Sequence, residues 1–168
     1  LAARRRMDLH GATSTDFAKV KVKNATNGLA NPNARYQKAV TVDDVLASPV
    51  VSDPLHLLEI CATSDGGAAI VLASMDFARR HAASAGAPVR VAAVSTVTPS
   101  YPNTVIDLPD LATDSSAVVA EPERRFKASI AHAAYEEAGI GPEDLSLAEV
   151  YDLSTALELD WYEDIGLC

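Results

Sequence analysis

The sequence has few cysteines and few aromatic residues. Its two cysteines, Cys61 and Cys168, lie far apart in 168 residues and have no CxxC spacing. This arrangement indicates neither a disulfide framework nor a zinc site. The four histidines also lack metal-ligand spacing, so no metal is expected. Apolar residues make up 48% of the chain and aromatic residues 5%, a composition typical of an ordinary globular protein.

Long apolar runs are missing as well. No run approaches the roughly 20 apolar residues that a membrane-spanning helix needs. The first ten residues, LAARRRMDLH, have neither the apolar core nor the cleavage site of a signal peptide. We therefore expect no membrane association, and the sequence predicts a cytoplasmic protein.

Negative charge dominates, but it is unevenly distributed. The net charge is -9, yet residues 1–40 hold eight Lys or Arg against two acidic residues. This basic end has little aromatic interleaving and no recognisable nucleic-acid motif, so no nucleic-acid partner is expected. Two interpretations remain open for it: a solvated basic face, or a surface that binds a phosphorylated ligand.

Helical patterns occur along the whole chain. Each starts with a capping residue or a proline, and four of them end at a glycine. The expected helices are residues 16–28 after Thr15, 42–47 after Thr41, 75–86 after Ser74, 122–139 with Pro122 in the first turn, and 155–166 after Ser154.

Three segments between these helices have the pattern of β-strands. Residues 68–73 are a continuous apolar run, typical of a strand buried on both faces, residues 89–97 have the pattern of a second buried strand, and residues 146–152 form a third. Alternating strands and helices predict a three-layer α/β fold with a largely parallel sheet. Three strands are few for such a sheet, so we expect a fragment or one half of a split protein.

Several short motifs recur in one known family. They are KN followed by NP (residues 23–24 and 31–32), then ASP, PL and SDGGAA in the segment that ends at residue 74. Together with AEVYDLSTALELDWYEDIGLC (residues 148–168), they resemble the sterol-carrier and lipid-transfer branch of the thiolase superfamily. The resemblance covers nearly the whole chain.

The resemblance implies a partial thiolase-like αβα fold. Residues 1–60 would belong to the inserted loop domain, residues 61–86 to the end of the N-terminal half and residues 87–168 to the first part of the C-terminal half. The nucleophilic cysteine of thiolases would lie upstream, and the GHP histidine and second catalytic cysteine downstream. The isolated chain is therefore expected to be inactive, and the full protein is expected to be a thiolase-type homodimer.

Tyr151 marks a departure from the thiolase pattern. Thiolases carry His or Asn at this place to orient an oxyanion-hole water, and Leu153 here replaces a Cys of one family version. A tyrosine resembles instead the steroid side-chain-cleaving aldolases, which split a β-hydroxyacyl-CoA into propionyl-CoA and a ketone. That resemblance implies a CoA thioester as substrate, no separate cofactor and a small OB-fold partner protein.

The residues themselves are compatible with this chemistry. A retro-aldol step needs a base for the β-hydroxyl proton and a donor to the forming enolate, and a phenol can serve as either. Tyr151 could instead be an amphipathic residue at a sheet edge. Tyr101, on a proline-flanked loop after residues 89–97, is the second catalytic candidate, and Tyr36 and Asp152 are secondary ones.

The family also suggests a CoA site. In this interpretation, Cys61 and Ser64 line the pantetheine channel. The cations that would meet the CoA phosphates are Arg4, Arg5, Arg6, Lys19, Lys21 and Lys23. Two alternatives remain open for the function: a sterol-carrier-type thiolase (an acetyl-CoA acyltransferase), and a non-catalytic lipid-binding module.

Overall fold

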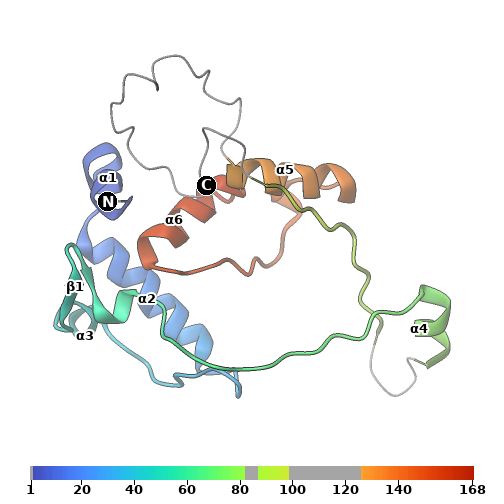
Figure 1. Cartoon of the computed structure of the whole chain (residues 1–168), viewed down its shortest axis with the longest axis horizontal. Helices are drawn as coiled ribbons and strands as arrows, with labels where there is room; N and C mark the ends of the chain where they lie inside the picture. Colours follow the sequence, from blue (N-terminus) through green and yellow to red (C-terminus); the bar gives the residue numbers. More distant parts are fainter. Residues whose placement is uncertain (1, 82–86, 99–125) are drawn as a thin grey trace, which may run out of the picture.

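Four helices make up most of the ordered body of the protein. The computed structural model describes residues 2–81, 87–98 and 126–168. Helices α1 (Ala2–His10) and α2 (Ser14–Gly28) both contact α6 (Thr155–Asp164), and α5 (Phe126–Ala138) also packs on α6 (Figure 1). The body therefore joins the two ends of the chain, and α6 lies at its centre.

The core of this body is small and apolar. Phe17 of α2 is fully buried and clusters with Ala3 of α1 and Ala156 of α6. Met7, Ala12, Leu55 and Leu159 pack around this cluster. Burial of these side chains is what holds α1 and α2 against α6, since short helices are marginal on their own.

Helix α2 begins two residues earlier than the sequence pattern indicates. Its N-cap is Thr13, whose side chain accepts a hydrogen bond from the backbone N–H of Asp16 at 3.3 Å. The Asp16 carboxylate accepts in return from the backbone N–H of Thr13 at 3.0 Å, which completes a capping box. The expected cap at Thr15 is wrong, because only Thr13 has an acidic residue three positions later.

This cap gives a test of the local structure. We expect Thr13→Ala to lower the free energy of unfolding by about 1 kcal/mol, because an amide at the helix start loses its partner. The Thr13 hydroxyl also donates to the Asp16 carboxylate at 2.7 Å, and this hydrogen bond, with the one from the Thr13 backbone N–H, holds the pKa of Asp16 below its ordinary value. The pKa of Asp16 should therefore rise in the variant. Urea unfolding and an NMR titration measure the two effects. Thr15→Ala is the matched control, and equal effects of the two substitutions would contradict the assignment.

The other helix ends agree better with the sequence. Thr41 caps α3 (Val42–Leu46), and Ser74 accepts from the Phe77 amide at 3.2 Å at the start of α4 (Met75–His81). Gly139 follows α5 with φ +69°, a conformation that glycine adopts without strain. Ser154 occupies the N-cap position of α6, although its side chain makes no capping hydrogen bond.

One helix and a two-stranded hairpin have no counterpart in the predicted pattern. Residues 2–10 form α1, and Val50–Ser52 (β1) pairs antiparallel with Leu55–His56 (β2). The 3-10 turn η1 (Leu57–Glu59) follows β2, and a second one, η3 (Pro142–Asp144), follows α5. The Asp53-Pro54 dipeptide at the hairpin turn is a typical turn signal that could have indicated β1 and β2.

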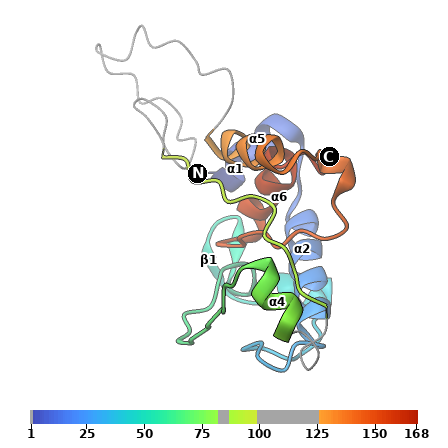
Figure 2. The same cartoon turned by 90° about the vertical axis from the view of Figure 1, so that its right-hand side faces the viewer.

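The three predicted strands are wrong as hydrogen-bonded elements. Residues 68–73, 89–97 and 146–152 have no strand assignment, and in the described ranges the β1–β2 hairpin is the only sheet. The first two runs are nevertheless extended, and they connect to α4, which lies apart from the other helices in Figure 1. Figure 2 views the molecule from this side, with α4 toward the viewer. Ile70 and Val71 are 86% and 91% exposed.

The physical reason is that a strand of this type depends on its neighbours. Continuous apolar strands are stable when sheet partners flank them and helices cover both faces. No such partner lies beside residues 68–73 within the part of the chain that the structure describes.

Among the described residues, no helix is long and apolar enough to cross a membrane.

Candidate active site

The predicted corner at Tyr151 is present and is held by the backbone. The Cys61 amide donates to the Leu153 carbonyl at 3.1 Å, and Ile60 and Ser154 form an isolated antiparallel bridge. Ser154 is buried, and α6 starts directly after it. The chain therefore turns from an extended stretch into a helix against the segment that follows η1.

The two residues before this corner differ in their contacts. The Tyr151 side chain is 62% exposed. The Asp152 carboxylate accepts a hydrogen bond from the Asn24 side-chain amide of α2 at 3.2 Å. Successive side chains of an extended stretch point to opposite sides, so an Asp152 that faces α2 leaves Tyr151 facing solvent.

A buried carboxylate lies behind the corner. Glu158, in the first turn of α6, is 1% exposed. Lys23 and Asn24 of α2 donate to its two oxygens at 2.5 Å each, and the Tyr162 hydroxyl donates to it from the next turn. Lys23 also donates to the Tyr162 hydroxyl at 2.5 Å. Every oxygen of this desolvated charge therefore has a partner, as a buried carboxylate requires.

Lys23 and Tyr162 both keep their protons near neutral pH. Burial raises the pKa of the Tyr162 phenol, and its hydrogen bond to Glu158 raises it further. Burial lowers the pKa of Lys23, but its hydrogen bonds to Glu158 and Tyr162 outweigh this and raise it above the ordinary value. Lys23 thus stays cationic and Tyr162 stays neutral, which suits a structural cluster better than a proton relay.

Several of the predicted CoA-binding cations make ion pairs within the protein. Arg6 pairs with Asp160 at 2.7 Å and with Glu163, and Arg4 pairs with Asp53. Lys23 pairs with Glu158. Arg6 and Lys23 therefore have a clear role in joining α1 and α2 to α6.

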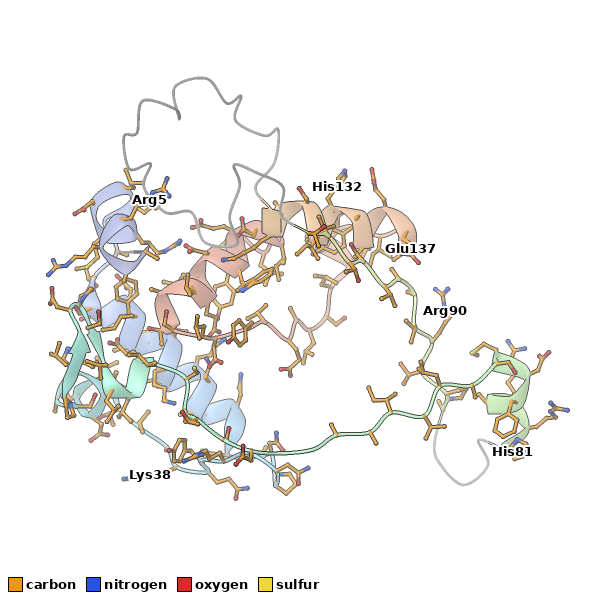
Figure 3. The ribbon with its side chains drawn as sticks, viewed as in Figure 1. Arg5, Lys38, His81, Arg90, His132 and Glu137 are labelled. Carbon is orange, nitrogen blue, oxygen red and sulfur yellow. The ribbon has the colours of Figure 1, made fainter. Side chains whose placement is uncertain are left out.

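The remaining cations of the set, Arg5, Lys19 and Lys21, also belong to α1 and α2. Lys19 pairs with the neighbouring Asp16 at 3.3 Å, and Lys21 is half-buried on α2. Figure 3 labels Arg5 on α1, the helix that also carries Arg4 and Arg6. The proposal that these cations bind phosphate stays a prediction.

The Tyr36 loop reaches the same edge of the molecule as the corner. The Arg35 guanidinium donates to the Thr63 carbonyl and also lies over the Tyr36 ring, 5.3 Å from its centroid. Cys61 and Ser64 are both exposed on this segment. The structure thus brings the edge at residues 61–64 beside the Tyr151 corner and links it to the Tyr36 loop.

One predicted site residue is not described by the structure, and three residues of the buried cluster were not predicted. Tyr101 lies outside the described residues. Asn24, Glu158 and Tyr162 were not predicted as site residues from the sequence. The signal was present in the spacing, since Glu158 and Tyr162 are four residues apart on one helix face and Lys23-Asn24 is the KN pair.

Among the described residues, no group of three His, Cys, Asp or Glu side chains could hold a metal ion.

Comparison with known proteins shows which family this chain is similar to. Residues 112–168 match the family described as Thiolase C-terminal domain-like. A solved structure described as "Ltp2-ChsH2(DUF35) aldolase" superimposes with a TM-score of 0.76 at 31% identity and covers 99% of this chain. The chain is thus thiolase-like along its length, which confirms the resemblance and the partial α/β fold class.

Three of the similar curated proteins have names that describe different roles. The chain is 34% identical to benzoylsuccinyl-CoA thiolase subunit BbsB of Thauera aromatica over 100% of its own length. It is 32% identical to sterol carrier protein 2 of Bos taurus and 31% identical to a steroid side-chain-cleaving aldolase of Thermomonospora curvata, each over 99% of this chain. Identities this close do not separate the three activities.

The chain is much shorter than these relatives. It spans 40% of the length of BbsB and of the Thermomonospora curvata aldolase, 29% of the bovine sterol carrier protein and 41% of the solved aldolase chain. The activity of a whole relative therefore does not transfer directly to this segment.

Proposed function

We propose that this chain is part of a thiolase-like carbon-carbon lyase that cleaves a β-hydroxyacyl-CoA, such as a shortened steroid side chain, by a retro-aldol reaction. Tyr151 is its proton-transfer residue, with Tyr101 as the second. The exposed phenol at the corner before α6 carries the proposal. Two aldolases among the similar proteins support it.

The reaction needs only proton transfers around one bond cleavage. A base removes the β-hydroxyl proton, the oxygen forms a ketone, and the electrons of the broken carbon-carbon bond move into a thioester enolate. Protonation of the enolate α-carbon then releases the shorter acyl-CoA, which is propionyl-CoA when the fragment has three carbons. No cysteine nucleophile and no free CoA take part in these steps.

A tyrosine needs help to act as the base. A phenol with an ordinary pKa near 10 holds its proton at neutral pH. Tyr151 lies three residues before the first turn of α6, and the free amides at a helix N-terminus favour negative charge nearby. They could stabilise either a phenolate or the enolate oxygen. The negative charge of Asp152 would oppose a phenolate, but its carboxylate accepts a hydrogen bond from the Asn24 side chain.

Further parts of the proposal concern ligand and partners. The basic residues Arg5, Lys19 and Lys21 of α1 and α2 would meet the CoA phosphates, and the exposed Cys61 and Ser64 would lie along the pantetheine arm. The solved aldolase is described with a DUF35 protein, and this supports a small OB-fold partner. We further propose a thiolase-type homodimer in the cytoplasm.

The requirement for free CoA as a second substrate distinguishes a thiolase from this lyase. The full-length protein should convert a β-hydroxyacyl-CoA to a ketone and a shorter acyl-CoA without added free CoA, because no thiol enters the reaction. Mass spectrometry of the CoA products measures this directly. A β-ketoacyl-CoA with free CoA is the matched thiolase substrate. Turnover of that substrate alone would reject the lyase and favour the thiolase, as the similarity to BbsB would suggest.

A further inference from the structure

One polar side chain connects the buried cluster to the candidate corner. The Asn24 side-chain nitrogen donates to the Glu158 carboxylate at 2.5 Å and to the Asp152 carboxylate at 3.2 Å. An amide NH₂ carries two hydrogens, so it can serve both acceptors at once. Asn24 is thus a bridge between α2, the first turn of α6 and the residue next to Tyr151.

The anchor of this bridge is rigid. Glu158 is 1% exposed, and Lys23 and Tyr162 bind the oxygen that Asn24 does not use. Because a carboxylate without partners would be costly at this depth, Glu158 has little freedom to move. The Asn24 amide is therefore held from one side by a fixed acceptor, while its other hydrogen meets an exposed aspartate.

We propose that Asn24 is a positioning residue, which uses the buried Glu158 carboxylate as an anchor to hold Asp152 and thereby orients the adjacent Tyr151. The inference rests on the proposed function for its catalytic consequence. The geometric part is independent, because it concerns only how firmly the corner is held.

The amide is the chemical group that this place requires. A side chain between two carboxylates must donate to both, and asparagine does so without adding charge. An aspartate of the same shape would bring a third carboxylate against Glu158 and Asp152. The backbone pairing of Leu153 with Cys61 lies one residue further on, so loss of the bridge should loosen this hydrogen bond as well.

The test is Asn24→Asp in the full-length protein. We expect kcat to fall about tenfold with KM within about twofold, because Tyr151 is misplaced while the binding surface is retained. The amide of Cys61 should exchange its hydrogen about tenfold faster, since it donates to the corner. Steady-state kinetics and NMR hydrogen exchange measure the two effects.

Asn27→Asp is the matched control. It makes the same chemical change on the same helix at an exposed position, so it should leave kcat and the Cys61 exchange rate unchanged. Combining Asn24→Asp with Asp152→Asn again places a hydrogen-bond donor opposite an acceptor at positions 24 and 152. This double variant should recover part of both losses. A merely structural asparagine would give no such rescue.

The outcomes separate the two proposals. Equal Cys61 exchange and equal kcat in the two single variants would overturn the positioning role. Absence of retro-aldol turnover in the unchanged protein would reject the proposed function, and the exchange experiment would still decide the positioning role. If Asn24→Asp does not fold, Asp152→Ala at the exposed end of the bridge should accelerate Cys61 exchange, and an unchanged rate would again overturn the inference.

Discussion

Tyr151→Phe in the full-length protein should lower the retro-aldol kcat by about 10²–10⁴-fold. The substitution removes only the hydroxyl, so it deletes the proton-transfer group and keeps the shape of the ring. KM should change little, because the exposed ring makes its contribution in the proton-transfer step rather than in holding CoA. Steady-state kinetics with a β-hydroxyacyl-CoA measures both constants.

Tyr135→Phe is the control for this experiment. Tyr135 lies on α5 and donates its hydroxyl to the Ile165 carbonyl at 2.7 Å, at the C-terminal end of α6 and away from the corner. Its loss should affect stability slightly and turnover not at all. Retention of full activity by Tyr151→Phe would remove Tyr151 from the mechanism and make Tyr101 the next residue to test.

Phe17→Ala should produce the largest change in stability. Phe17 is fully buried where α1, α2 and α6 meet. Its truncation should lower the free energy of unfolding by about 3–5 kcal/mol, because both transfer energy and packing around the cavity are lost. The melting temperature should fall by roughly 10 °C. Urea unfolding and thermal scans of the full-length protein measure this change.

Phe77→Ala provides the comparison within the same chain. Phe77 lies on α4, is 48% exposed and stacks on the neighbouring His81 ring at 4.1 Å. Its truncation should cost well under about 1 kcal/mol, because little area is removed from contact. Equal losses at the two positions would mean that the cluster around Phe17 is not the main core.

The local signals in the sequence predict helices better than strands. Thr41, Ser74 and Gly139 act within one turn of their own helix, so the sequence alone identifies these helix ends. Residues 68–73 have a strand pattern, but a strand is completed by hydrogen bonds from other segments. A sequence pattern can indicate that a segment is suited to a sheet, but the neighbouring strands that complete the sheet come from other segments.

The site was predictable only in part for a similar reason. Tyr151 and Ser154 stand out because they flank a recognisable turn into a helix. Asn24 and Glu158 are 134 positions apart, and neither is unusual in its own helix. Their relationship arises from the packing of α2 on α6, which pairs polar side chains that no local spacing connects.

The exposed run at residues 68–73 has a consequence for the biogenesis of the protein. It contains six small or branched apolar residues without charge or proline, and such a segment, when unpaired, can stack with identical copies into cross-β aggregates. Asp65 and Asp76 flank the run and, as gatekeeper charges, oppose this stacking. We therefore expect that rapid shielding of this run during synthesis favours the yield of usable protein.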